Sequence, residues 1–258
     1  MKVVPEGYSF TLFLSFDLDA ESAEVWRRAD PVAISRGRFG VKVGVWRVLE
    51  VLERYGLRVT FFVPGWVAEN YPDVVKSIAE AGHEVAAHGY LHERLDELGE
   101  RDAEENVFEL AERFIGQCCG GPQGFRAPYW RWSENTLAIL MDRGYLYDSS
   151  LMDSDEPYVI EEGGRRLVEL PVDWRLDDWP YLEQHRCIEP RSLLSMWLEE
   201  LRFYRDRGGY VAITMHPQCI GRGARIAVLR ELVEEALAMG AWIPRGIDIA
   251  RLVAGEGR

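Results

Sequence analysis

Residues 10–19 have the sequence FTLFLSFDLD, and this stretch decides the fold. Residues 10–17 are mostly aromatic, aliphatic or β-branched, which predicts a buried β-strand. Asp17 and Asp19 follow where that strand ends. Side chains two positions apart in a strand point to the same side, so both carboxylates are expected to face one site. Because a buried carboxylate pair is costly without a partner, the pair indicates an ion-pair or metal site at this strand end.

Outward from this stretch, short apolar runs alternate with longer amphipathic segments. The predicted strands cover residues 10–17, 58–65, 83–88, 124–128, 145–150, 210–217 and 241–244. The predicted helices cover residues 43–56, 71–82, 102–116, 133–144, 190–209 and 225–240. This alternation is typical of repeated βα units around a mainly parallel sheet or barrel, so we expect an α/β fold. Functional side chains of such folds gather at the carboxyl ends of the strands.

The composition is that of a compact globular protein, with 47% hydrophobic and 28% charged residues, which excludes fibrous and disordered classes. The formal net charge of -13 argues against nucleic acid or an anionic membrane as partner, because both require basic patches. No apolar run approaches the roughly 20 residues that span a bilayer. The N-terminal segment runs directly into the first strand, and removing it as a signal peptide would delete both aspartates. We therefore expect a cytoplasmic protein.

His88 and His92 occur in the sequence AAHGYLHERL, four positions apart. On a helical turn this spacing would point both imidazoles the same way. Two histidines and one carboxylate form a sufficient ligand set for a divalent metal and leave positions open for water and substrate. The second aspartate of the first strand would then remain as a general base beside the metal.

Five motifs stand at predicted strand ends: DLD (17–19), HGYLH (88–92), FRAPYW (125–130), PVDWRLDDW (171–179) and ITMHP (213–217). As an ordered set, they resemble the polysaccharide deacetylase family, also called carbohydrate esterase family four. The resemblance extends from about Phe10 to Leu252. It implies one catalytic domain over residues 1–258, folded as a distorted (β/α) barrel of about seven strands. It also implies hydrolysis of acetamide or related C–N bonds.

The resemblance also assigns roles to individual residues. It makes Asp17 the catalytic base and Asp19, His88 and His92 the metal ligands. Arg126 would orient Asp17, the backbone N–H after Pro128 would help to hold the oxyanion, and His216 would protonate the leaving nitrogen. These roles are chemically consistent, because an amide nitrogen leaves poorly unless it is protonated and a tetrahedral intermediate needs donors at its oxygen. Taken alone, His216 is equally compatible with a core histidine, and Arg126 with a structural ion pair.

The acid that supports His216 is expected from the PVDWRLDDW segment. We favour Asp178 or Asp177 over Asp173, and place Asp178 among the catalytic residues. Four aromatic residues in the motif loops are expected to line the substrate site: Tyr129, Trp130, Trp174 and Trp179. Arg222 and Arg225 follow the histidine strand and fit either a solvated surface or recognition of a carbonyl or carboxylate.

Two departures from the common family pattern bear on the substrate. The first motif is Asp-Leu-Asp rather than two adjacent aspartates, and the second is His-Gly-Tyr-Leu-His. These variants resemble a cytoplasmic branch that includes Helicobacter-type peptidoglycan deacetylases, cyclic imide hydrolases and allantoinase-like proteins. A cytoplasmic protein has little access to assembled cell wall, which favours a small cyclic imide, ureide or N-acyl substrate. The retained ligand set argues against the metal-free members.

Three other functions are compatible with parts of the pattern. The first is N-deacetylation of peptidoglycan or chitooligosaccharides, and the second is a catalytically silent binding protein stabilised by the metal. The third is a His₂-carboxylate oxygenase, which the absence of a closely spaced His-x-Asp motif disfavours. Zinc is the expected metal, although iron, cobalt and nickel suit the same ligands. The resemblance further implies a homo-oligomer, expected to be a tetramer.

Overall fold

The protein is described here by a computed structural model that covers residues 3–184 and 188–255. Its strands form a single sheet of nine strands among these residues. They are β1 (Phe10–Asp17), β2 (Thr60–Val63), β3 (Glu84–Ala87), β4 (Gly124–Phe125), β5 (Tyr147–Asp148), β6 (Tyr158–Glu162), β7 (Arg165–Glu169), β8 (Tyr210–Met215) and β9 (Ala241–Trp242). The mixed α/β class expected from the sequence is confirmed.

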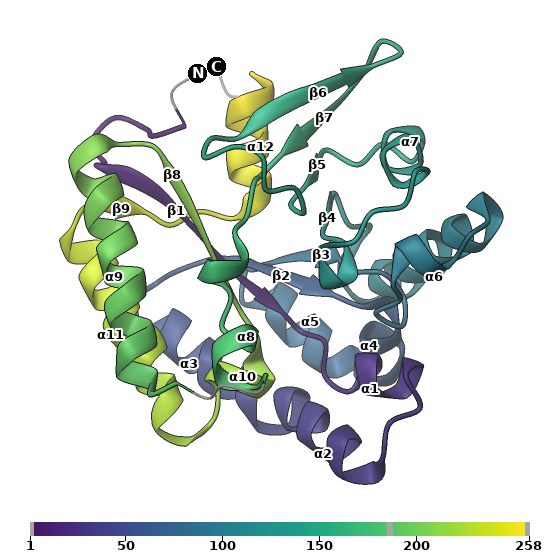
Figure 1. The fold of residues 1–258 in the computed structure, drawn as a ribbon, viewed down its shortest axis with the longest axis horizontal. Coiled ribbons are helices and arrows are strands. Elements are labelled where there is room, and N and C mark those ends of the chain that lie inside the picture. Colours follow the sequence, from purple (N-terminus) through teal and green to yellow (C-terminus); the bar gives the residue numbers. More distant parts are fainter. Residues whose placement is uncertain (1–2, 185–187, 256–258) are drawn as a thin grey trace.

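The α-helices of the described residues flank this sheet (Figure 1). They are α1 (Ser22–Trp26), α2 (Pro31–Phe39), α3 (Val45–Arg54), α4 (Gly65–Asn70), α5 (Pro72–Glu80), α6 (Arg101–Cys119), α7 (Thr136–Asp142), α8 (Trp179–Leu182), α9 (Pro190–Arg207), α10 (Pro217–Ile220), α11 (Ile226–Ala238) and α12 (Gly246–Ala254). A π-helical turn, Gly40–Gly44, precedes α3, and short 3₁₀ turns lie at Leu95–Glu97, Pro128–Trp130, Trp174–Leu176 and Gly223–Arg225. None of the helices in the described part of the chain combines the length and apolar character needed to cross a membrane.

The strands lie in the order β6-β7-β5-β4-β3-β2-β1-β8, and β9 also pairs with β1. All pairings are parallel except β6 with β7, which form an antiparallel hairpin. This hairpin accounts for the excess over the seven or so strands that we expected, because neither of its strands was predicted. After β7 the chain crosses to the far edge of the sheet, where Asp177 forms a parallel bridge with Thr214 of β8. One short segment therefore links β7, which lies next to the edge strand β6, to β8 at the opposite edge.

Alternate side chains of the strands enter two different cores. Leu12, Leu14 and Phe16 of β1 pack in the larger core, which also takes in buried residues of α3, α5, α9 and α11. Phe13 packs in the smaller core, with Phe62, Tyr147 and residues of α12. Strands buried on both faces are typical of parallel sheets covered by helices, which explains why β1 is buried at every position and carries apolar residues on both of its faces.

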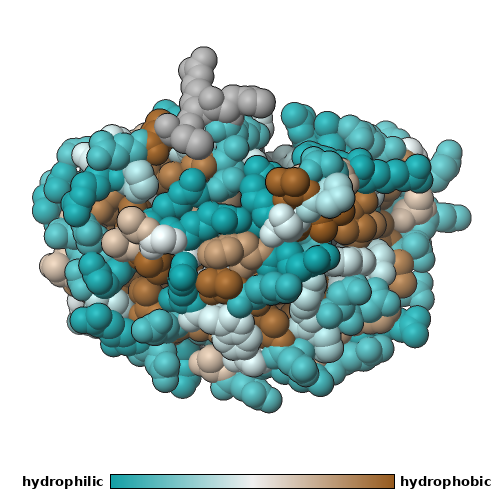
Figure 2. All heavy atoms as spheres, turned by 90° about the horizontal axis from the view of Figure 1, so that it is seen from below, coloured by the Kyte–Doolittle hydropathy of each residue, from teal (hydrophilic) through white to brown (hydrophobic). Residues whose placement is uncertain are grey.

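The outer surface differs clearly from this interior. Figure 2 shows the molecule from the side of α1 and α2, where hydrophilic residues cover most of the face and hydrophobic ones appear in separate patches. Acidic residues outnumber basic ones, 43 to 30, in the chain as a whole.

Candidate active site

The motif residues converge at the carboxyl ends of four parallel strands, which lie within one stretch of the sheet from β4 to β8. Asp17 is the last residue of β1, His88 follows β3, Arg126 follows β4 and His216 follows β8. Parallel strands end on the same side of the sheet, so side chains from these positions meet there (Figure 1). All four are buried together with Asp19 and His92. The predicted convergence is therefore confirmed.

His88 and His92 lie in a loop, so the helical turn that we expected for them is wrong. His92 has a φ of 58°. The buried carboxylate of Glu93 accepts hydrogen bonds from the backbone N–H groups of Tyr90, at 3.0 Å, and Leu91, at 2.8 Å. Glu93 thus holds a tight turn that brings the two imidazoles together without helical geometry.

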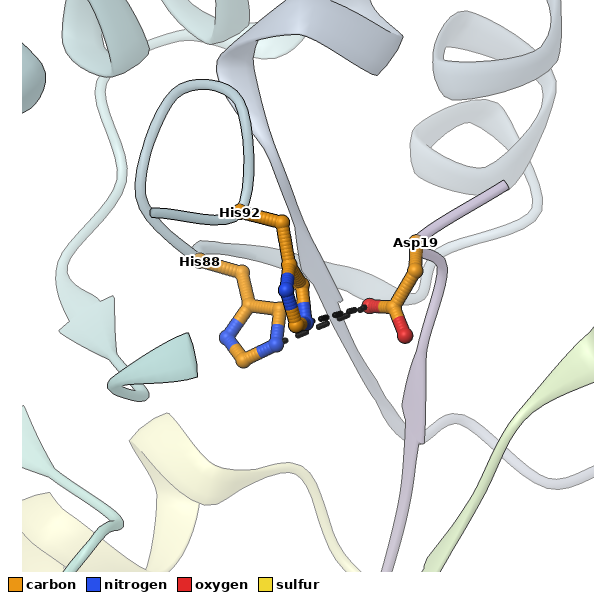
Figure 3. A group of neighbouring side chains, drawn as sticks. All are labelled: Asp19, His88 and His92. Atoms are coloured by element: carbon orange, nitrogen blue, oxygen red, sulfur yellow. Dashed lines mark ion pairs between the residues drawn. The ribbon is translucent and has the colours of Figure 1, made fainter. Parts of the chain in front are cut away.

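Asp19, His88 and His92 form a compact triad, shown in Figure 3. The Nε2 atoms of His88 and His92 each lie 3.6 Å from Asp19 Oδ1. This separation is too long for a good hydrogen bond. It is close to the ~3.4 Å between two ligands of a tetrahedral metal with bonds of about 2.1 Å. Asp19 Oδ1 is buried and has no hydrogen-bond partner among the described residues. The donor set therefore fits a divalent cation.

Both imidazoles are in the form that binds metals. Burial lowers the pKa of His88 to about 4 and lowers that of His92 well below its usual value, so both rings are neutral at neutral pH. His88 Nδ1 lies 2.7 Å from the backbone oxygen of Arg126. Since a carbonyl only accepts, Nδ1 carries the proton and Nε2 presents its lone pair toward Asp19.

Asp17 is held by Arg126, whose side chain is fully buried. Arg126 Nη1 donates to Asp17 Oδ1 at 2.7 Å and to Ser15 Oγ at 2.9 Å. Burial raises the pKa of Asp17, but Arg126 outweighs that effect, helped by His88 and His216, and the net pKa is lowered. Asp17 is therefore ionised at neutral pH. Its Oδ2 faces His88 Nε2, at 3.8 Å, and His216 Nε2, at 3.9 Å.

His216 is anchored by Asp178, the residue that we favoured. Asp178 Oδ1 lies 2.8 Å from His216 Nδ1 and accepts the His216 backbone N–H at 3.0 Å. Asp177 Oδ1 is 3.5 Å from the same ring nitrogen and accepts the backbone N–H of Trp179. Asp173 instead pairs with Arg175 at the surface. Burial lowers the pKa of His216, but the Asp177 and Asp178 carboxylates outweigh it and raise that pKa well above its usual value.

The four aromatic candidates differ in position. The ring centroid of Tyr129 lies 4.4 Å from that of His92, and that of Trp179 lies 5.7 Å from that of His216. Trp130 stacks on the guanidinium of Arg126, 4.9 Å from its ring centroid. Trp174 is 53% exposed and has no ring or hydrogen-bond contact with the other candidates in the described structure. Arg222 and Arg225 bind backbone oxygens, and Arg225 also pairs with Glu183.

The backbone is strained around this site. Ala20, His92, Tyr129 and Trp130 have φ values between 50° and 58°, a region that residues other than glycine seldom adopt. The Tyr129 N–H makes no hydrogen bond to any residue that the structure describes. Strain of this kind persists only where surrounding contacts enforce it, and it clusters at functional sites.

Gln218 is a site residue that the sequence analysis missed. Its Nε2 donates to Asp19 Oδ2 at 3.3 Å, and the side chain is buried. Two glycines of the π-helical turn make room for it. A Cβ at Gly40 would lie 3.1 Å from Gln218 Oε1, and one at Gly44 would lie 2.1 Å from the Pro217 oxygen. The sequence feature that could have identified Gln218 is its position directly after the ITMHP motif.

Comparisons with known proteins agree with this geometry. Residues 39–147 match the polysaccharide deacetylase family. A structure from Mycobacterium smegmatis assigned to the polysaccharide deacetylases is 37% identical, with a TM-score of 0.92 over 98% of this chain and 93% of that one. The peptidoglycan deacetylase of Helicobacter pylori is 28% identical over 86% of this chain and 89% of its own length. An allantoinase structure shares the fold, with a TM-score of 0.90 at 21% identity over 98% of this chain and 93% of that one. The chain therefore belongs to the polysaccharide deacetylase family of hydrolases.

Proposed function

We propose that residues 1–258 form one catalytic domain that hydrolyses non-peptide C–N bonds with the help of a divalent metal. One observation carries the proposal. Asp19 Oδ1 is buried without a hydrogen-bond partner in the described part of the chain and faces the Nε2 atoms of two neutral imidazoles, while an ionised Asp17 lies directly alongside. A buried, unpaired carboxylate oxygen is costly, and a cation between these three atoms removes that cost.

Asp19, His88 and His92 would hold the metal, and zinc is the expected ion, with iron, cobalt or nickel as alternatives. When bound, such a cation lowers the pKa of water and polarises a carbonyl oxygen. Two of the proposed ligands are oriented by hydrogen bonds to other residues. The Arg126 carbonyl fixes the tautomer of His88, and Gln218 binds the other oxygen of Asp19.

Asp17 acts as general base in this proposal. Arg126 occupies Asp17 Oδ1, so Oδ2 is left to take a proton from the attacking water. The water oxygen then bonds to the carbonyl carbon, and the carbonyl oxygen gains negative charge. The N–H of Tyr129 is the donor that stabilises this charge.

His216 acts as general acid. Asp178 binds its Nδ1, so the Nε2–H is directed toward the aspartates of the reaction site. Nε2 gives its proton to the leaving nitrogen as the C–N bond breaks, and the acyl carbon becomes a carboxylate. The nitrogen leaves as an amine from an N-acyl compound, and as the amide or urea group of the opened ring from a cyclic imide or ureide. The ion pair with Asp178 holds the ring in the orientation that this transfer requires.

A small substrate is favoured by how little the site is exposed. Each of the five residues of the proposed reaction site is only 2–7% exposed: Asp17, Asp19, His88, His92 and His216. Tyr129 covers His92 and is itself covered by Arg27, at 4.6 Å, while Arg36 covers Trp179 on the other side, at 5.3 Å. Such enclosure suits a cyclic imide, ureide or short N-acyl compound better than a polymer strand.

N-deacetylation of peptidoglycan or chitooligosaccharides is the second candidate function. The similarity to the Helicobacter pylori peptidoglycan deacetylase along most of the chain favours it. The same base, acid and ligand set can hydrolyse an acetamide, so the residues named above do not distinguish the two. Enclosure of the site is the observation that ranks the small substrate first.

The test is a substrate panel on metal-stripped protein that is reloaded with zinc, iron, cobalt or nickel. The panel contains succinimide, hydantoin, allantoin and N-acetylglucosamine oligomers, and turnover is measured with and without a chelator. Metal-dependent turnover of the small compounds supports the proposal, and turnover of the oligomers alone overturns its substrate class. Tight metal binding without turnover of any compound would identify a silent binding protein. Light scattering of the same samples measures the mass of the protein in solution and so tests whether it is the expected homotetramer.

A further inference from the structure

Two acidic residues outside the proposed reaction site lie side by side in the interior. The parallel register of β5 and β7 places Asp148 opposite Glu169, and both residues are 0% exposed. Asp148 Oδ2 and Glu169 Oε2 are buried, and neither accepts a hydrogen bond from a donor among the described residues. A proton on one of these two carboxyl groups would let it donate to the other, and each group affects the pKa of its neighbour. Neither residue has a role in the mechanism proposed above.

The remaining oxygen of each carboxyl group is already occupied. Glu169 Oε1 accepts the backbone N–H groups of Ser150, at 3.1 Å, and Leu151, at 2.9 Å. Asp148 Oδ1 accepts the Ser150 hydroxyl at 2.8 Å. Two touching carboxylates without solvent cannot both ionise, because each charge raises the free energy of the other. Burial raises the pKa of both residues, that of Asp148 to about 6 and that of Glu169 well above its usual value, and Asp148 adds to the effect on Glu169.

The pair is connected to the reaction site through Ser149 and Ser150. Ser150 Oγ, which is bound to Asp148, accepts the backbone N–H of Ala127 at 2.9 Å. The Ser149 carbonyl accepts Arg126 Nε at 3.1 Å, and Ser149 Oγ accepts Arg126 Nη2 at 2.9 Å. The guanidinium that holds Asp17 therefore rests on a segment that the two acids fix in place.

We propose that Asp148 and Glu169 share one proton and are positioning residues that keep Arg126 aligned on Asp17. The catalytic consequence rests on the proposed function, whereas the shared proton does not. With one proton the pair carries a single negative charge and the hydrogen bonds to Ser150 stay formed. Loss of that proton would place two negative charges against each other and strain the segment under Arg126.

The titratable groups facing the pair come from three other elements. Arg126 follows β4, Tyr158 lies on β6 and Tyr210 on β8. Burial raises the pKa of both phenols, so they are neutral near neutral pH. The positive charge of Arg126 therefore lies between the negative charge of Asp17 and that of the singly charged pair.

The first test follows the proton in the metal-loaded protein. We expect an infrared C=O band of a protonated carboxyl group at neutral pH, which Glu169→Gln removes. The pair's pKa is raised by folding, so its contribution to stability is present at low pH and is lost as pH rises through that pKa. Glu169→Gln keeps a permanent donor to Asp148 and should flatten this loss. An unchanged band and an unchanged pH dependence in Glu169→Gln overturn the shared proton.

The second test follows position. Ser150→Ala keeps both acids but cuts their link to Ala127. We expect faster hydrogen exchange at Arg126 Nε–H and a fall in kcat on the order of tenfold to 10²-fold, with little change in KM. Glu169→Leu should behave similarly, and Glu169→Gln should rescue it. The control is Glu161→Gln, which changes an exposed acid on β6 that pairs with Arg166 at 3.3 Å. Unchanged exchange and kcat in Ser150→Ala overturn the positioning role, and the exchange result stands even if no substrate is found.

Discussion

Glu84, the first residue of β3, and Asp19, just beyond the last residue of β1, are both buried acids at opposite ends of the sheet. Their surroundings differ. Glu84 Oε2 accepts the Thr60 hydroxyl, at 2.6 Å, and the Ile247 N–H, at 3.0 Å, and Oε1 accepts the Tyr147 hydroxyl at 3.0 Å. Asp19 has one oxygen bound by Gln218 at 3.3 Å and one with no partner among the described residues.

This difference separates a stabilising acid from a functional one. Glu84 helps to bind the N-terminus of α12, where a negative charge is favourable. All its acceptors are used, so its burial contributes to the fold. Asp19 leaves a buried acceptor open, which lowers stability unless a cation completes it. Of these two acids, the one with an oxygen that lacks a hydrogen-bond partner among the described residues lies at the reactive end of the sheet.

The largest expected effect is at the reactive end, from Asp17→Asn. Removing the proposed base should lower kcat by about 10²- to 10⁴-fold. Metal content should be unchanged, because Asp17 is not among the three proposed ligands. Turnover and elemental analysis on the same preparation check this prediction. A variant with a near-normal rate would refute the base assignment.

Loss of a ligand should come next in magnitude. His92→Ala should weaken zinc binding by more than about 10²-fold, since even groups that only orient a ligand contribute 10- to 100-fold. Chelator competition measures the affinity. His83→Ala is the matched control, because this histidine lies before β3 and binds the Val59 N–H instead. Equal affinity in the two variants would remove His92 from the metal site.

At the other end of the sheet, Glu84→Ala should change stability and not chemistry. It leaves the Thr60 and Tyr147 hydroxyls and the Ile247 N–H without their acceptor, so the free energy of unfolding should fall by about 2–4 kcal/mol. Urea denaturation and kcat measured below the transition check this. A loss of kcat in the folded variant would show that the two ends are coupled and would break the comparison.

A smaller effect is expected from Gln218→Ala, which removes the side chain bound to Asp19 Oδ2. Zinc affinity should fall by about tenfold, because partners that orient a ligand contribute at this scale. The control is Gln117→Ala on the exposed face of α6. If the affinity of Gln218→Ala equals that of the wild type, Asp19 is oriented by other contacts.

The smallest effect concerns pH. Burial raises the pKa of Glu84, although Thr60, Ile247 and Tyr147 partly oppose it. Its contribution to stability is therefore full below the ordinary glutamate pKa and declines as pH rises through the raised value. The difference in unfolding free energy between wild type and Glu84→Gln should shrink over that range, by at most about 1.4 kcal/mol per pKa unit. A difference that grows with pH would contradict the sign.

The strand ends were predictable from the sequence because each functional residue follows an apolar run. The eight residues of β1 and the apolar run before His216 each predict a strand, and each also predicts that a functional residue lies at the end of that strand. The turn at His88–His92 was not predictable from spacing, because it depends on the buried Glu93 carboxylate and on a positive φ at His92. Helices α1 and α2 were also missed: α2 includes Gly37, whose Cβ would lie 2.3 Å from the Ala20 oxygen, a contact between segments that no local pattern encodes.

The pairing of β1 also bears on how the chain folds. β1 lies between β2 on one side and β8 and β9 on the other, and Asp19 is 199 residues from the Gln218 that contacts it. Contacts so distant in sequence form slowly, because a long loop must close before they contribute. During synthesis, one edge of the buried strand β1 stays unpaired until β8 leaves the ribosome. The nascent chain is therefore most vulnerable to aggregation until residues 210–215 have been made, and the reactive end is completed only after Gln218 has joined it.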